Sequence, residues 1–187
     1  HFIKRFPECK ENTDIYYNPI CKADVLKKAD EDISYEFDDS LTNIVTVGRL
    51  TPEKGIDMIP EITTLLLNAG YKIHWFVIGD GTCKEDLLKK IAQNHLNAHI
   101  TLTGNQLNPY PFIKQCDIYV QPSYEEGYST TICEAGILGK AIIGTTTSGG
   151  IREQIENGVS GLLAEPTPGN IANKIAEIIK DKNLKQN

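Results

Sequence analysis

The chain has few of the residues on which several classes of protein depend. Among its 187 residues, Lys and Arg number 19 against 25 Asp and Glu, so the net charge is −6. Nucleic acids select basic surfaces through their phosphate backbones, and this balance therefore argues against a nucleic-acid partner. The sequence also has no Asn-X-Ser/Thr sequon, no secretory signal and no apolar run approaching the roughly 18 residues of a membrane span.

Cysteine, histidine and acidic residues give no sign of a metal centre. The 5 Cys include no Cys-X-X-Cys pair, and none of them has a metal-ligand spacing with the 4 His. A scattered, odd number of thiols fits a reducing compartment, so we expect a cytoplasmic protein. The Asp-Glu-Asp run at 30–32 lies in a polar segment and does not follow an apolar strand, and we interpret it as solvated charge.

From residue 43 onward, short apolar runs alternate with amphipathic stretches. The expected strands cover 43–50, 72–81, 99–104, 117–123, 140–145 and 160–166. The expected helices cover 55–70, 84–96, 108–116, 129–138, 151–158 and 169–181. Such alternation predicts a parallel sheet with helices on both faces. The fold class is therefore α/β, a doubly wound, Rossmann-like parallel sheet.

Helical periodicity also predicts which side chains of the first two helices face the core. In the first helix these are Ile56, Ile59, Ile62, Leu66 and Ala69. In the second they are Leu87, Leu88, Ile91 and Ala92.

The alternating pattern covers residues 42–181, which we predict to form one domain. Residues 1–41 are polar and acidic, with only 14–20 resembling a strand, and we interpret them as a linker and the remnant of a preceding domain. Residues 182–187 form a tail. Because the first residue is His and not Met, we expect the chain to be a piece of a longer protein.

Unusual residues follow the first strand of the predicted sheet, at the edge where ligands bind in open parallel sheets. Gly48 allows close approach of the backbone, and Arg49 and Lys54 place two cations on one loop. Arg offers a planar fork to phosphate oxygens and Lys a mobile point charge. We expect the next helix to begin near Gly55 and to add the partial positive charge of its N-terminus. The alternative is a solvated loop of salt bridges.

A second loop, after the fourth strand, carries a Glu-Gly pair and several hydroxyls. We expect Gly127 to relieve backbone strain, and Ser129 or Thr130 to cap the helix that follows. The free N–H groups of its first turn would then form an anion site. Glu134 follows on the same helix and would be partly desolvated. The separation of Glu126 and Glu134 alone carries no weight, because acidic residues are frequent in this chain.

Five short motifs occur in order along the chain. They are Gly48-Arg49-Leu50 with Glu53-Lys54-Gly55, Val77-Ile78-Gly79-Asp80-Gly81, Glu126-Gly127-Tyr128 with Glu134-Ala135, Ser148-Gly149-Gly150, and Asn157-Gly158 with Gly161-Leu162-Leu163. Together they resemble the C-terminal, donor-binding domain of the retaining GT-B glycosyltransferases of family four (glycosyl transferases group 1). The resemblance covers about residues 42–180 and makes 42–181 a nucleotide-sugar-binding domain.

The resemblance implies a role for each matching residue. Arg49 and Lys54 would hold the donor diphosphate and assist its departure, with help from the N–H groups at Thr130 and Thr131. The transferred hexosyl group would be oriented by Glu126 with the backbone of Gly127 and Tyr128, beside Ser129, and Glu134 would bind the ribose hydroxyls. The loops at Gly79–Gly81 and Gly104–Asn105 would flank the base, and Gly48 would also contact the substrate.

The same resemblance implies partners and a reaction. The donor would be a nucleoside diphosphate sugar and the acceptor a glycan or a lipid-linked glycan, as in polysaccharide biosynthesis. An acceptor-binding domain would precede this one, and through it the full-length protein would lie at the inner face of the membrane. No metal or other cofactor is required, because fixed cations and N–H groups stabilise the leaving diphosphate.

Two rival functions remain open. A nucleotide-sugar epimerase could use the same scaffold, and so could a non-catalytic nucleotide-binding module. A dehydrogenase is disfavoured, because neither of the first two strand ends carries Gly-X-Gly-X-X-Gly. The chain departs from the family at Ser129, where Pro is usual, so the identity of the donor also stays open.

Overall fold

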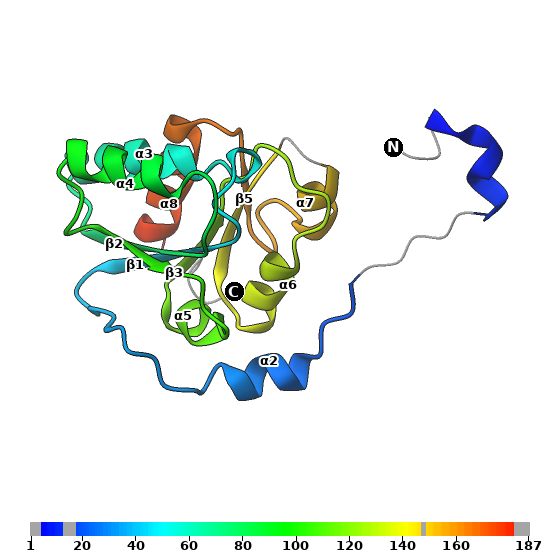
Figure 1. Cartoon of the computed structure of the whole chain (residues 1–187), viewed down its shortest axis with the longest axis horizontal. Helices are drawn as coiled ribbons and strands as arrows, with labels where there is room; N and C mark the ends of the chain where they lie inside the picture. The colour runs from blue at the N-terminus through cyan, green and yellow to red at the C-terminus, as the bar shows by residue number, and fades with distance from the viewer. Residues whose placement is uncertain (1–4, 13–17, 147–148, 182–187) are drawn as a thin grey trace.

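The computed structural model describes residues 5–12, 18–146 and 149–181, and its centre is a six-stranded parallel sheet (Figure 1). The strands are β1 (Thr42–Val47), β2 (Ile73–Ile78), β3 (Ile100–Gly104), β4 (Ile118–Gln121), β5 (Ala141–Thr145) and β6 (Leu162–Ala164). They are ordered β3-β2-β1-β4-β5-β6, and each neighbouring pair is parallel. Strands are thus added outward in one direction from β1 to β3 and in the opposite direction from β4 to β6. The switch point between β1 and β4 is where such sheets bind ligands.

Helices cover both faces of the sheet, which confirms the predicted doubly wound architecture (Figure 1). On one face lie α3 (Ile59–Asn68), α4 (Lys84–Gln93) and α8 (Pro168–Lys180). On the other lie α5 (Tyr110–Gln115), α6 (Thr130–Ile137) and α7 (Gly149–Gln154). The central strands are therefore apolar on both faces, as continuous Ile, Val and Phe runs require.

A chain of buried hydrogen bonds crosses the three central strands. The Trp75 indole on β2 donates to Thr46 Oγ1 on β1 (3.1 Å), and the Thr46 hydroxyl donates to the Val120 carbonyl on β4 (2.7 Å). Trp75 is fully buried, so its N–H needs such a partner. The chain of bonds holds β1 and β4 together directly beneath the switch point.

The predicted helix faces were partly wrong. Ile56, Ile59, Ile62 and Leu66 are buried as expected, whereas Ala69 is exposed because α3 ends at Asn68. On α4, only Leu87 and Ile91 are buried, and Leu88 and Ala92 are exposed. The two buried residues are four positions apart and form one narrow stripe, so the neighbouring positions turn toward solvent.

The segment before β1 is packed against the domain over part of its length. Helix α2 (Lys22–Lys28) lies against α5 and α6 (Figure 1). Further along, the ring of Phe37 stacks on Phe76 at 4.3 Å, and Tyr35 contacts Phe112 at 5.3 Å between ring centroids. The first element, η1 (Pro7–Asn12), is a short 3-10 helix. The boundary at residue 42 stays a prediction, and the tail at 182–187 and most of the strand predicted at 14–20 lie outside the described residues.

The acidic run at 30–32 lies on the surface of the described part of the chain. Asp30, Glu31 and Asp32 are exposed, and the Asp30 carboxylate pairs with the ammonium of Lys114 on α5. Among the described residues, no group of His, Cys, Asp or Glu side chains is arranged to hold a metal ion. Within the same ranges, none of the helices has the length and apolar character needed to cross a membrane.

Candidate functional site

Backbone contacts join the loops that follow β1, β2 and β3. The Gly48 N–H donates to the Ile78 carbonyl (3.0 Å), and the Gly79 N–H donates to the Gly104 carbonyl (2.8 Å). A Cβ atom on Gly79 would lie 1.9 Å from the Gly48 oxygen, and its φ of 141° is one that other residues rarely adopt. Glycine is therefore required at position 79 for the first two loops to meet.

A cavity of about 370 Å³ opens above these loops. It is lined by Val47, Gly48, Arg49, Ile78, Gly79, Asp80, Asn105 and Gln106. Four of the residues predicted from sequence, Gly48, Arg49, Gly79 and Asn105, thus surround one space. Gly81 and Gly104 belong to the same group of loops but do not line the cavity. Gly81 lies so close to the Leu50 carbonyl that a Cβ atom would be 2.5 Å from its oxygen.

The loop after β1 is also bonded to the loop after β4. The backbone N–H groups of Tyr124 and Glu125 both donate to the Glu53 carbonyl, at 2.9 and 3.1 Å. Gly55 has a φ of 63°, and a Cβ atom there would lie 2.2 Å from the Pro122 oxygen. Main-chain contacts on both sides of residue 54 therefore fix its position against the loop that carries Glu126.

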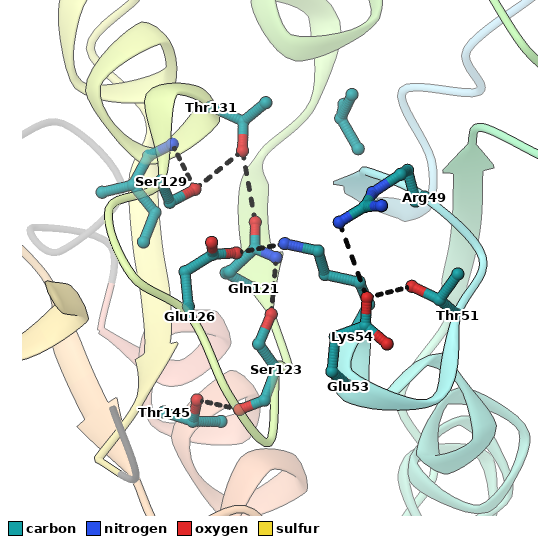
Figure 2. Close-up of polar contacts among 12 residues, drawn as sticks. Arg49, Thr51, Glu53, Lys54, Gln121, Ser123, Glu126, Ser129, Thr131 and Thr145 are labelled. Atoms are coloured by element: carbon teal, nitrogen blue, oxygen red, sulfur yellow. Dashed lines mark hydrogen bonds and ion pairs between the residues drawn. The ribbon is translucent and has the colours of Figure 1, made fainter. Parts of the chain in front are cut away.

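Lys54 and Glu126 form an ion pair across this junction. The Lys54 Nζ atom lies 2.5 Å from Glu126 Oε2, and the two side chains are only 16% and 12% exposed (Figure 2). Sequence reasoning singled out both residues but did not predict that they pair. Their pairing joins the cation of the first loop to the carboxylate of the second, at the switch point of the sheet.

Arg49 lies at the same edge of the sheet as Lys54, but its side chain is much more exposed to solvent. Its guanidinium lies 3.6 Å from Glu53 Oε1, and its side chain is 75% exposed. Figure 2 shows its guanidinium on the same side of the loop as the Lys54 side chain. Glu53 also accepts a hydrogen bond from the Thr51 hydroxyl (2.7 Å), which lowers the pKa of the Glu53 carboxyl. Arg49 is thus held lightly, in contrast to Lys54.

The helical segment after Lys54 begins at Ile56, directly after Gly55 as predicted, but its first turn is a 3-10 turn. Two short 3-10 turns, η2 (Pro52–Lys54) and η3 (Ile56–Met58), come first, and α3 starts at Ile59. The left-handed conformation of Gly55 separates the two turns and prevents a continuous helix.

The start of α6 is built as the sequence indicated. Ser129 caps the helix, because its Oγ atom accepts from the Ile132 N–H (3.3 Å) and lies 2.9 Å from Thr131 Oγ1. The N–H groups of Thr130 and Thr131 belong to the first turn, where an α-helix provides no carbonyl four residues earlier. This turn lies on the same rim as the Lys54–Glu126 pair (Figure 2).

A buried polar network beneath this turn was missed from the sequence. The Tyr119 hydroxyl donates to Gln121 Oε1 (2.8 Å), Thr131 donates to the same oxygen (3.2 Å), and Gln121 Nε2 donates to Ser123 Oγ (2.9 Å). Burial raises the pKa of Tyr119, which keeps its hydroxyl protonated as a donor. The signal was a glutamine at the end of an otherwise apolar strand, where an unpaired amide would be costly.

Glu134 lies in a separate environment from Glu126. On α6, its Oε1 accepts a hydrogen bond from the Tyr110 hydroxyl of α5 (3.0 Å). Burial raises the pKa of the Glu134 carboxyl, and the bond from Tyr110 partly offsets that effect. Sequence reasoning predicted a partly desolvated carboxylate in need of donors but did not identify Tyr110.

Gly127 differs from expectation. Gly127 has ordinary backbone geometry and open space around it, so it relieves no strain. Its carbonyl instead faces Gly150 at the start of α7, where a Cβ atom would lie 1.3 Å from the oxygen. The Tyr128 hydroxyl lies 3.3 Å from Cys133 Sγ on α6. Ser148 of the fourth motif lies outside the described residues.

The fold and the residues at this edge of the sheet define a class of protein. It is a Rossmann-like domain that has two cations, Arg49 and Lys54, beside the N-terminus of α6 at its switch point. The Glycosyl transferases group 1 family matches residues 27–187. The chain belongs to that family.

The names of two curated relatives agree with this assignment. One relative is the N-acetylgalactosamine-N,N'-diacetylbacillosaminyl-diphospho-undecaprenol 4-alpha-N-acetylgalactosaminyltransferase of Campylobacter jejuni, with 28% identity over 87% of this chain and 43% of its own length. Another is an uncharacterized glycosyltransferase of Methanocaldococcus jannaschii, with 32% identity over 75% of this chain and 39% of its own. The chain therefore spans about two fifths of the length of these relatives.

The structure of Anabaena HepE in complex with UDP and glucose superposes with a TM-score of 0.71. The match covers 78% of this chain and 41% of HepE at 23% identity. It shows that the two share a fold, a Rossmann-like α/β domain built on a parallel sheet.

Proposed function

We propose that this chain is the C-terminal, donor-binding domain of a retaining glycosyltransferase of family four. The enzyme would move a hexosyl group from a nucleoside diphosphate sugar to a glycan or lipid-linked acceptor. The observation that carries the proposal is the position of Lys54, held at the switch point against the loop that leads into the capped start of α6. The solved complex of HepE with UDP and glucose supports a donor of this kind.

The leaving diphosphate would bind between the first loop and the start of α6. It gains negative charge as the bond to the sugar breaks, so cations and N–H groups already in place there lower the barrier. Lys54 supplies a fixed charge, and the exposed guanidinium of Arg49 can turn toward phosphate oxygens at little cost. The first-turn N–H groups of Thr130 and Thr131 would complete the site.

The transferred sugar would lie beside Glu126. The ion pair with Lys54 fixes this carboxylate next to the cation that would hold the diphosphate, so sugar and leaving group are oriented by one unit. The carboxylate, together with the backbone at Gly127 and Tyr128, would accept and donate hydrogen bonds to sugar hydroxyls. Catalytic roles in this proposal fall to Glu126, Arg49 and Lys54.

The nucleoside would occupy the remaining part of the rim. Glu134 would accept hydrogen bonds from the two ribose hydroxyls, with Tyr110 holding its other side. The base would enter the cavity lined by Gly48, Gly79 and Asn105. No metal ion is needed in this scheme, because protein cations and amides carry the diphosphate charge.

The partners proposed for the whole protein follow from its relatives. An acceptor-binding domain would complete the cleft. The Campylobacter relative is named for an undecaprenol-linked substrate, and a Saccharomyces cerevisiae relative is a phosphatidylinositol N-acetylglucosaminyltransferase subunit. A lipid-linked acceptor at the inner face of the membrane is the corresponding proposal for this protein.

Calorimetric titration of the chain with UDP and GDP, and with their glucose and N-acetylglucosamine conjugates, tests the donor site. We expect one of the two nucleotides to bind, with equal affinity in EDTA and in Mg²⁺. Failure of both nucleotides to bind would overturn the proposal. Binding that disappears in EDTA would overturn its metal-free part.

A further inference from the structure

We propose that Gln154 of α7 is a positioning residue for the diphosphate site, an inference that rests on the proposed function. Its side-chain amide is bonded to both backbone groups of the residue that caps α6. Gln154 Oε1 accepts from the Ser129 N–H (2.9 Å), and Gln154 Nε2 donates to the Ser129 carbonyl (2.7 Å). Nε2 also donates to Cys133 Sγ (3.1 Å). The amide therefore has its acceptor and both its donors engaged, in one orientation.

Helix α7 is a rigid base for this contact. Ile151 and Ile155, on either side of Gln154 in sequence, are 0% and 3% exposed. Both lie directly over Gly144 of β5, where a Cβ atom would come within 2.6 Å of Ile151 Cγ2 and 2.8 Å of Ile155 Cδ1. The missing side chain at position 144 lets α7 sit close to the sheet. The position of the Gln154 amide is therefore fixed by the core.

The same helix contacts the site loop at a second point. Gly150 lies against the Gly127 carbonyl, and a Cβ atom on it would also lie 3.1 Å from the backbone carbonyl oxygen of Glu126. Helix α7 thus holds the segment 126–129 at both ends, by close packing at one and by a pair of hydrogen bonds at the other. The segment carries the carboxylate that pairs with Lys54 and leads into the first turn of α6.

Loss of the Gln154 amide should weaken binding of the diphosphate and leave binding of the nucleoside unchanged. Ser129 determines where α6 begins, and the first-turn N–H groups of Thr130 and Thr131 follow it directly. If the amide of Gln154 is removed, the buried Ser129 N–H loses its acceptor, and the segment can shift to reach water. Gln154 does not line the cavity at Gly48, Gly79 and Asn105, which would therefore keep its shape.

The test compares two substitutions of Gln154. The affinity of each variant for a nucleotide is compared with its affinity for the matching nucleoside. Gln154→Leu removes the amide at similar size, and Gln154→Glu keeps an acceptor for the Ser129 N–H but sets a carboxylate against the Ser129 carbonyl. UDP and GDP are each titrated by protein-observed NMR beside uridine and guanosine. Gln115→Leu is the matched control, because this exposed glutamine bonds, within the described part of the chain, to the Pro111 carbonyl of its own helix.

We expect both Gln154 variants to bind the nucleoside as the original chain does and to lose about five- to tenfold in affinity for the diphosphate. The Gln115→Leu chain should match the original for both ligands. Equal affinity for the diphosphate in the Gln154→Glu variant and the original chain would overturn the inference, as would equal losses for diphosphate and nucleoside. If the original chain binds neither UDP nor GDP, the proposed function fails first.

Discussion

The ammonium of Lys54 lies 2.5 Å from a carboxylate oxygen of Glu126, 72 positions further along the chain. Both side chains are mostly shielded from solvent, and backbone bonds from Tyr124 and Glu125 to the Glu53 carbonyl hold the two loops together around them. The pair connects the loop after β1 to the loop after β4, at the place in the sheet where the strand order reverses. A diphosphate bound there would meet a cation that already has a partner.

Substitution of this pair separates its structural role from its role in binding. Lys54→Met leaves the Glu126 carboxylate without its partner and should lower the free energy of unfolding by about 1–3 kcal/mol. The double variant Lys54→Met/Glu126→Gln should lose less than the sum of the two single variants. Urea denaturation of all four chains measures this coupling, and strictly additive losses would show that the ion pair contributes nothing to stability.

The same chains have different expected affinities for UDP or GDP. Lys54→Met should bind the nucleotide about tenfold or more weakly, because a charge-assisted contact is lost. Glu126→Gln should bind the free nucleotide at least as well as the original chain, since it removes a negative charge from beside the phosphate. Calorimetry distinguishes the two, and a weakened Glu126→Gln variant would place the carboxylate in a different role.

Arg49 should matter for binding and hardly at all for stability. Its side chain is 75% exposed, so Arg49→Ala should change the free energy of unfolding by under about 0.5 kcal/mol. Its nucleotide affinity should fall, and the dependence of that affinity on salt should become shallower. Lys89→Ala is the control, because it removes an exposed charge from α4. Identical salt dependence in the original and Arg49→Ala chains would remove Arg49 from the site.

The pH dependence of stability reports on Glu134. Burial raises its pKa in the folded chain above the ordinary 4.5, so the folded state binds a proton more readily than the unfolded state. Stability contributed by this group is therefore lost as pH rises from about 4.5 through the raised pKa. Glu134→Gln should abolish that loss. Tyr110→Phe should move it to higher pH, because the hydrogen bond that lowers the pKa is gone.

Nucleotide binding should follow the opposite course over the same interval. Only the ionised Glu134 can accept from both ribose hydroxyls, so the affinity of the original chain, relative to Glu134→Gln, should rise with pH. The ratio of the two affinities cancels the titration of the nucleotide's own phosphate. A ratio that stays constant from pH 4.5 to 8 would contradict ribose binding by this carboxylate.

Gly79 offers a test of the frame that supports the cavity. Gly79→Ala would place a Cβ atom 1.9 Å from the Gly48 oxygen at a φ of 141°, and should cost about 2 kcal/mol or more. Gly169→Ala is the matched control, because a Cβ atom there meets nothing within 4 Å and the residue lies in α8. It should be neutral or stabilising by up to about 1 kcal/mol. Equal stability of the two variants would contradict the close approach.

The sequence was informative where one local pattern determined the outcome. Alternation of strands and helices was sufficient for the sheet and its two covered faces, and the hydroxyls before an apolar helix limited the N-cap to Ser129 or Thr130, of which the structure shows Ser129. The start of the helical segment beside Gly55 was predictable too, whereas the 3-10 geometry of its first turn was not. The close approach of Gly55 to the Pro122 carbonyl, far away in sequence, could not be predicted either.

Contacts between distant loops could not be obtained in this way. Nothing in the spacing of Lys54 and Glu126 indicates that they pair, and Tyr110 lies on a helix that carried no functional signal. Gln154 is similar, because its importance depends on two backbone atoms of Ser129 on another helix. Single residues at the rim were predictable as candidates, whereas their partners depend on how the strands are ordered.

The loops around the cavity meet through main-chain atoms, at Gly48 with Gly79 and at Gly55 with Pro122. Contacts of that kind do not depend on which side chains the neighbouring positions carry. Under the proposed function, substitutions at Asn105 or Tyr128 would therefore change which base or sugar is accepted without changing these main-chain contacts. A new donor preference would then require only a few point substitutions on an unchanged scaffold.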